Sequence, residues 1–215
     1  MHTRMEWLMY YALQAELGVE IDIYKGGKTY DEWVGAQRQD FISLIVHGRN
    51  YVALVTEDQT QPIGLFGCVV NTLQVPTATA VALLIAVTCD DNDQRRMFRD
   101  LASYLIRRAV CGLGKNAYKP IFLSLLNALR THGCTPVVLE THLTSLHGEA
   151  AAWPGDERFR LSLQQGMHDN SSVRELSQLL QAWPRPSPAL SAPQPSRTTR
   201  RRKASRHAPA ERPLQ

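Results

Sequence analysis

The sharpest change from hydrophobic to polar positions along the chain lies between residues 80 and 114. Residues 80–88 are almost entirely apolar, include several β-branched side chains and form a run too short to cross a bilayer. This pattern predicts a strand that is buried on both faces. After an acidic turn, apolar residues recur from Gln94 at three- and four-residue spacing, which predicts an amphipathic helix that ends at the glycines of residues 112–114.

Amphipathic spacing also predicts two helices near the N-terminus. The first covers residues 5–17 and stops at Gly18, a residue type that favours helix C-termini. The second begins at Thr29, because the spacing of Thr29 and Glu32 fits a capping box, and it ends at Gly48.

The C-terminal half contains further helical patterns. Residues 121–132 are strongly apolar, with a proline just before them and a glycine just after, which suits a helix. The same residues also fit a strand over 121–125 followed by a helix from Leu126, and periodicity does not choose between the two. Two more helices are expected, over residues 156–165 and 172–182.

Further strands complete the expected sheet. Residues 51–56 and 63–70 are predicted to form an antiparallel hairpin, and residues 136–141 another strand. Gly64 and Gly67 lie inside the second arm of the hairpin, which indicates a bulge or a close approach of two backbones. The expected fold class is therefore α/β, with a mixed, mostly antiparallel sheet flanked by helices.

Composition changes completely after Trp183. Residues 184–215 contain seven of the twelve prolines, eight basic side chains and one glutamate, which gives this segment a net charge of +7. Because the whole chain carries +4, residues 1–183 carry −3. A segment of this composition cannot bury enough apolar surface to offset the entropy lost on ordering. We therefore expect one domain over residues 1–183 and a disordered basic tail over residues 184–215, called here the cationic segment.

The cysteines indicate a reducing compartment. The chain has four cysteines without CxxC spacing, and its first residues lack the apolar stretch and cleavage site of a secretion signal. Buried free thiols are expected. The expected location is cytoplasmic, with the nucleus or a virion as alternatives, and no membrane partner is expected.

Arginines mark the start of the helix that follows residues 80–88. Arg95, Arg96 and Arg99 lie in its first turns. Helix N-termini favour anions, because unpaired N–H groups and the helix dipole both attract negative charge. These residues are therefore candidates for binding a phosphate. The alternative is a solvated helix face whose charge is partly offset by neighbouring aspartates.

The order helix, helix, hairpin, strand and helix resembles the GNAT-type N-acetyltransferase family over residues 3–145. Residues 51–55 and 61–66 look like the family's second and third strands, and residues 127–133 and 138–141 look like parts of its C-terminal half. The resemblance implies an acetyltransferase-like fold with acetyl-coenzyme A as cofactor. The chain is equally similar to degenerate, non-catalytic members of this fold among bacteriophage internal virion proteins, so its status as an enzyme stays open.

The resemblance implies two alternative positions for the family's pyrophosphate-binding loop. One lies at residues 91–97 and places Gln94, Arg95 and Arg96 nearest the cofactor phosphates. The other uses Gly112 and Gly114, which have the family's glycine spacing.

Acyl transfer to an amine needs a general base and an acid for the leaving group. Glu57 and Glu140 are the candidate bases, with Asp58 as an alternative, and Tyr118 is the candidate acid, with Cys134 as an alternative. Surface carboxylates and a packed tyrosine are the non-catalytic interpretation of the same residues.

No metal is expected, because the cysteine and histidine spacing matches no standard site. The side chains considered for zinc are His132, Cys134, His142 and His147.

The cationic segment contains the candidate site for nucleic acid. Its binding to a polyanion should be strongly salt-dependent and nearly independent of base sequence, because the segment has no aromatic side chain to stack on bases. A nuclear-localisation signal and a solubilising extension are the alternatives. Six residues form the predicted contact: Arg197, Arg200, Arg201, Arg202, Lys203 and Arg206.

Two functions of different classes therefore follow. The first is an acyl-CoA N-acyltransferase-like protein or a degenerate relative. The second is a viral or phage structural or accessory protein that binds nucleic acid through the cationic segment and assembles with itself or with other virion subunits.

Overall fold

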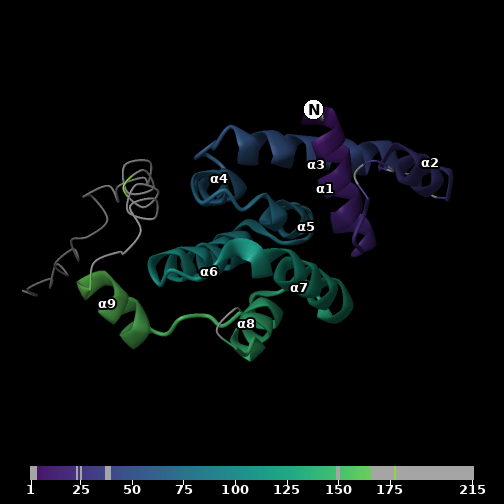
Figure 1. The fold of residues 1–215 in the computed structure, drawn as a ribbon. Helices are drawn as coiled ribbons and strands as arrows, with labels where there is room; N and C mark the ends of the chain where they lie inside the picture. The colour runs from purple at the N-terminus through teal and green to yellow at the C-terminus, as the bar shows by residue number, and fades with distance from the viewer. Residues whose placement is uncertain are drawn as a thin grey trace, which may run out of the picture. The chain divides into compact units, whose positions relative to one another are not determined.

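The computed structural model describes residues 4–22, 24, 26–36, 40–148, 151–165 and 177. Within these residues the chain is helical and contains no strand (Figure 1). Its α-helices are α1 (Arg4–Leu17), α2 (Gly26–Ala36), α3 (Asp40–Val55), α4 (Pro62–Thr72), α5 (Thr79–Thr88), α6 (Asp91–Val110), α7 (Tyr118–His132), α8 (Pro136–Ser145) and α9 (Asp156–Gln164). Two short 3₁₀ turns, η2 (Pro76–Ala78) and η3 (Lys115–Ala117), precede α5 and α7.

The α/β prediction is wrong, because every predicted strand is helical. Residues 51–56 begin within the last turn of α3, and residues 63–70 lie inside α4. Residues 80–88 belong to α5, and residues 136–141 open α8. An all-helical domain also contradicts the resemblance to the GNAT-type acetyltransferases, whose fold is built on a sheet.

Helix α5 shows why the strand prediction failed. It packs against α1, α3, α4, α6 and α7, and residues 79–85 are all buried. A helix surrounded by other helices is apolar on all sides, so its sequence loses the 3.6-residue period that distinguishes a helix from a buried strand. The alanines and leucines between its β-branched residues have high helix propensity, which agrees with the helix that the structure shows.

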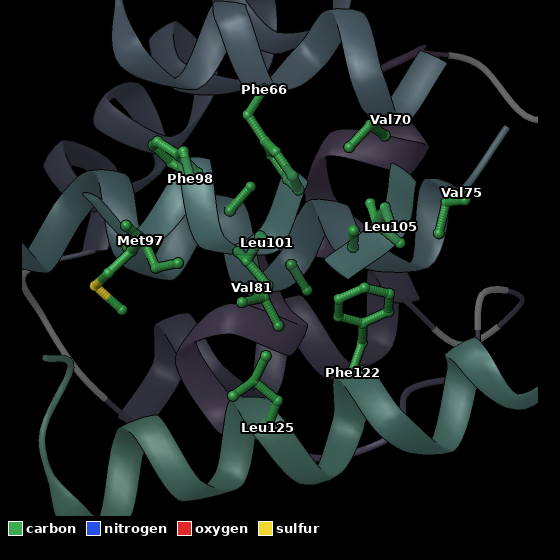
Figure 2. Packing of buried hydrophobic residues seen from close by; sticks show 14 of the residues in the cluster. Phe66, Val70, Val75, Val81, Met97, Phe98, Leu101, Leu105, Phe122 and Leu125 are labelled. Atoms are coloured by element: carbon green, nitrogen blue, oxygen red, sulfur yellow. The ribbon is translucent and has the colours of Figure 1, made fainter. Parts of the chain in front are cut away.

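The core forms where α4, α5, α6 and α7 meet. Phe66 of α4 stacks on Phe98 of α6, with ring centroids 5.3 Å apart and an interplanar angle of 18°. Figure 2 shows these two rings with Leu101 and Val81 between the helices, and Phe122 of α7 on the other side. All five side chains are buried, and a buried aromatic or leucine side chain contributes about 1.5–3 kcal/mol through its removal from water.

Two glycines let α4 approach the end of α3 closely. A Cβ atom on Gly67 would lie 2.2 Å from the Leu54 carbonyl oxygen, and one on Gly64 would lie 2.0 Å from the Asp58 carbonyl oxygen. Any larger side chain would therefore force the two backbones apart. The predicted close backbone approach is confirmed, although it joins two helices and not two strands.

Helix ends follow partly from local signals. Asp90 is the N-cap of α6, where its side chain accepts a hydrogen bond from the Asp93 N–H at 2.9 Å. The predicted cap at Thr29 is wrong, because α2 already begins at Gly26. Gly48 does not end a helix either, since α3 continues through it to Val55.

The helices predicted over residues 5–17, 94–111, 121–132 and 156–165 are confirmed, and the alternative strand over residues 121–125 is wrong. Of the helix predicted over residues 172–182, the structure describes Ser177 alone. The cationic segment lies outside the described residues, so the domain boundary at residue 183 and the disorder of the tail stay predictions.

Candidate functional site

Gln94 lies where the cofactor phosphates were expected, at the junction of α5 and α6. Its side-chain amide nitrogen donates to the Ala86 carbonyl at 3.2 Å and to the Cys89 carbonyl at 2.9 Å. An amide nitrogen has two hydrogens, so both are used on backbone carbonyls near the end of α5. Gln94 therefore caps a helix C-terminus, and its donors are not directed at a ligand.

The arginines that follow Gln94 lie at the surface. Arg95 is exposed. Arg96 lies 3.5 Å from the Glu140 carboxylate of α8, and Arg99 lies 3.7 Å from the Asp100 carboxylate. The Arg96 and Glu140 side chains are 48% and 55% exposed, and pairs of this kind contribute about 0–1 kcal/mol. This part of α6 is a solvated face with charges of both signs.

Gly112 and Gly114 lie at the other end of α6. Gly112 has φ of +67° and follows the helix, a position that suits glycine. The Gly114 carbonyl accepts a hydrogen bond from Arg108 at 3.3 Å. Because an α-helix rises about 1.5 Å per residue, the two glycines lie roughly 25–30 Å from Gln94 along the axis of α6. The two sets of predicted cofactor residues therefore do not form one site.

The three predicted catalytic residues have separate neighbours. Glu57 lies in the turn after α3 and accepts a hydrogen bond from the Asn71 side chain at 3.1 Å. Tyr118 is buried at the start of α7, and Glu140 faces Arg96. None of these contacts links one of the three residues to another. The alternative base, Asp58, accepts hydrogen bonds from Thr60 and Gln61, which lower the pKa of its carboxyl group and define the turn before α4.

The C-terminal part of α6 forms a cluster that sequence reasoning missed. Arg108 is fully buried, lies over the rings of Tyr104 and Tyr118 at 5.4 and 5.2 Å, and donates to the Ala152 carbonyl at 3.2 Å. The Tyr104 hydroxyl donates to the Ala151 carbonyl at 2.8 Å, and burial raises the pKa of Tyr104 to about 12. A signal was available, because helical spacing places Arg108 on the same face as the buried Leu101 and Tyr104.

Arg107 extends this cluster to α9. Its guanidinium donates to the Pro154 carbonyl at 3.1 Å, pairs with the Asp156 carboxylate and lies 5.1 Å from the centre of the Phe159 ring. Arg107 and Arg108 together hold residues 151–156 against α6. The contacts of this cluster are structural, since both guanidinium groups donate to backbone carbonyls of the same chain, and Arg107 also donates to the Ser103 hydroxyl and the Asp156 carboxylate.

A serine and a histidine meet between α7 and α8. The Ser124 hydroxyl lies 2.9 Å from the Ile121 carbonyl and 3.1 Å from Nε2 of His142. The hydroxyl donates to the Ile121 carbonyl, and the tautomer of the His142 ring sets which atom donates between Ser124 and His142. Burial lowers the pKa of His142, which favours the neutral ring. A hydroxyl whose proton is directed at a backbone carbonyl is not activated as a nucleophile by the histidine.

An apolar pocket of about 250 Å³ lies between α1, η2, α5 and α7. Its aromatic lining consists of Trp7, Tyr10, Tyr11 and Phe122. Glu20 and Lys119, which form an ion pair, also line it. Small-molecule sites have volumes of roughly 300–1,000 Å³, so this pocket suits a single side chain or a small ring better than a nucleotide.

In the part of the chain that the structure describes, no group of three or more His, Cys, Asp or Glu side chains is placed to hold a metal ion. In the same residues, no helix combines the length and the apolar character needed to span a bilayer.

No family model, curated protein or solved structure matches the chain. Together with the helical fold, this finding removes the support for an acetyltransferase. The expectation of acetyl-coenzyme A rested on the same resemblance, and the residues assigned to its phosphates have the structural contacts described above.

Proposed function

We propose that the chain is a nucleic-acid-binding accessory protein whose helical domain carries the cationic segment as its polyanion contact. The observation that supports this proposal is the separation of charge along the sequence. The cationic segment carries +7, whereas residues 1–183 carry −3. A polyanion is attracted to the segment and weakly repelled by the rest of the chain.

The surroundings of the arginines on α6 also favour the cationic segment as the binding element. Arg107 and Arg108 use their donors on the chain's own carbonyls and on Asp156. Arg96 and Arg99 lie beside carboxylates. A phosphate that approached this helix would compete with existing partners, whereas the run Arg200–Lys203 has four adjacent cations and no neighbouring acid in the sequence.

The proposal predicts binding with a steep dependence on salt. If the six predicted contact residues each neutralise one phosphate, affinity for duplex DNA falls about a thousandfold between about 50 and 200 mM salt. Replacing Arg200, Arg201, Arg202 and Lys203 with glutamine leaves two of the six charges, and the corresponding loss shrinks to about tenfold.

Fluorescence anisotropy of the full chain with a labelled duplex measures both quantities. A second duplex of unrelated base sequence is the matched control, and the two are expected to bind equally, since backbone contacts carry no sequence information. Affinity that is insensitive to salt, or that the four substitutions leave unchanged, contradicts the proposal. A strong preference for one duplex contradicts its sequence independence.

A further inference from the structure

Two cysteines from distant parts of the sequence meet at the surface of the helical domain. Cys89 lies between α5 and α6, and Cys134 lies between α7 and α8. Their sulfur atoms are 3.3 Å apart, and the Cys89 thiol also lies 3.2 Å from the Cys134 carbonyl oxygen. Both residues are half-buried, so a small oxidant has access to the pair.

The backbone at both positions is suited to forming a bond between the two sulfur atoms. A disulfide bond is about 2.05 Å long, so the sulfur atoms need to approach by a further 1.2 Å or so. Cys89 has an extended backbone just after α5, and Cys134 lies between the helix end at Gly133 and the extended Thr135. Neither cysteine is inside a helix: Cys89 is the C-cap of α5, where its N–H still donates to the Ile85 carbonyl at 3.0 Å, and Cys134 lies in the connection between α7 and α8.

The other two cysteines provide a comparison within the same molecule. The Cys68 thiol is buried in α4 and lies 3.7 Å from the Gly64 carbonyl oxygen. The Cys111 sulfur lies 3.5 Å from the Ser162 hydroxyl. These contacts of the two thiols are with oxygen atoms, whereas Cys89 and Cys134 also have each other's sulfur atom at 3.3 Å.

We propose that Cys89 and Cys134 form a reversible oxidation site, which hydrogen peroxide converts to an intramolecular disulfide. In the first step the Cys89 sulfur bonds to one peroxide oxygen, the O–O bond breaks, and water leaves with the thiol proton. In the second step the Cys134 sulfur attacks the resulting sulfenic acid, the S–O bond breaks, and a second water leaves with the Cys134 proton. Two thiols are oxidised and one hydrogen peroxide is reduced to two waters.

The order of the steps follows from the surroundings of the two thiols. Burial raises the pKa of Cys134 to about 12, so this residue is almost entirely a neutral thiol near pH 7. The thiolate is the attacking species, which makes Cys134 the poorer first nucleophile. Cys89 therefore reacts first. The Cys89 thiol is itself one of the groups that raise the pKa of Cys134, so its conversion to a neutral sulfenic acid removes that effect before Cys134 attacks. The proposal is independent of the cationic segment and of nucleic-acid binding.

Mass spectrometry of the full chain tests the site. The reduced protein is treated with hydrogen peroxide, and the remaining thiols are alkylated before digestion. The expected product is a peptide pair linked through Cys89 and Cys134, from a monomer lighter by two hydrogen atoms. The linked form is also expected to unfold at a temperature about 5–10 °C higher, and dithiothreitol should reverse the shift.

Single substitutions separate the two roles. Cys134→Ser should leave a sulfenic acid at Cys89 that dimedone traps, and Cys89→Ser should leave Cys134 largely unmodified. Cys111→Ser is the matched control and should form the same linked peptide as the parent. Oxidation of Cys89 to a sulfinic acid without a linked peptide, linkage through Cys68 or Cys111, or a bond between two molecules would each overturn the proposal.

Discussion

Helix α6 contains two pairs of arginines that are neighbours in sequence, one pair near each end, and the two pairs have opposite surroundings. Arg95 and Arg96, near its N-terminus, lie at the surface, and the partner of Arg96 is a half-exposed carboxylate. Arg107 and Arg108, near its C-terminus, lie against residues 151–156, and Arg108 is fully buried. The sequence shows the same dipeptide twice, so composition does not distinguish the two pairs. Helical phase does, because Arg108 falls on the apolar face of α6.

The comparison shows what a buried guanidinium needs. Carbonyl oxygens of Gly114 and Ala152 accept its hydrogen bonds, and the rings of Tyr104 and Tyr118 flank its charge. Arginine tolerates such a site because its planar group stacks on rings and is weakly hydrated. At the N-terminal end of the helix, solvent provides most of the stabilisation of the guanidinium groups, so replacing these arginines should change the free energy of unfolding little.

The largest effect is expected from Arg108→Ala. Truncation removes the packing of the fully buried side chain and leaves the Gly114 and Ala152 carbonyls without this donor, so the free energy of unfolding should fall by about 3–4 kcal/mol. Arg108→Lys should recover less than half of this loss, because an ammonium group does not span both carbonyls and both rings. Urea denaturation followed by circular dichroism measures the change. A loss below about 1 kcal/mol would show that Arg108 is no anchor.

A smaller and more local effect is expected from Arg107→Ala. This change removes the contacts with Pro154, Asp156 and Phe159, and should cost about 1 kcal/mol. Hydrogen exchange is the appropriate measurement, because the amides of α9 should exchange faster while those of α5 keep their protection. Uniform acceleration across the domain would mean that α9 is not held separately through Arg107.

Asp100, in the first half of α6, provides a test through pH. Burial raises its pKa above the value in the unfolded chain, and Arg99 only partly opposes the effect. The ionised form is therefore disfavoured by folding, so the contribution of Asp100 is most favourable below its unfolded pKa and is lost as pH rises through its folded pKa. Asp100→Asn should stabilise the protein at pH 7 by less than about 1 kcal/mol, and this gain should vanish near pH 3. Thermal unfolding at the two pH values checks the sign, and destabilisation at pH 7 would contradict it.

The smallest effect is expected from Arg96→Ala. The pair with Glu140 is half exposed at 3.5 Å, so the free energy of unfolding should change by no more than about 0.5 kcal/mol. The change should be reduced further by added salt, since solvent ions screen exposed charges. Urea denaturation of this variant is measured together with that of Arg108→Ala. Equal losses in the free energy of unfolding would contradict the difference between the two ends of α6.

The sequence predicted well those helices that have one solvent-exposed face. Helix α1 was expected over residues 5–17, and the helices over residues 94–111, 121–132 and 156–165 were also expected. In α1 and α6 polar residues separate the apolar ones at helical spacing, so the period is visible, whereas the helix over residues 121–132 was indicated by its flanking proline and glycine. The N-cap of α6, Asp90, lies in the acidic turn that was expected before this helix.

Two of the helices that were mistaken for strands, α4 and α5, are buried on most sides. Eight of the eleven residues of α4 are buried, and α5 is apolar around its whole circumference, so neither shows a helical period. Local signals for a helix were present at two places, because Pro62 and Pro136 each lie in the first turn and Thr135 caps α8. Prolines at these positions favour a helix start over a strand, and weighing them would have corrected two of the four strands.

The candidate sites also divide into those that could be predicted from the sequence and those that depend on how the helices pack. Arg108 was predictable as a buried residue from its helical phase. The meeting of Cys89 and Cys134 was not, because 45 residues separate them and their contact depends on how α5, α6, α7 and α8 pack. The roles predicted for Glu57 and Tyr118 depended on a sheet, and the residues that the structure describes form no strand.

One measurement tests the central claim most directly, namely that polyanion binding belongs to the cationic segment and not to α6. Duplex binding near 100 mM salt is compared for two full-length variants, one with Arg200, Arg201, Arg202 and Lys203 changed to glutamine, and one with Arg95, Arg96 and Arg99 changed to glutamine. The affinity of the first variant for the duplex should be lower than that of the parent by roughly a hundredfold or more. The affinity of the second should stay within about twofold of the parent. Retained binding in the first variant together with loss in the second would contradict the account.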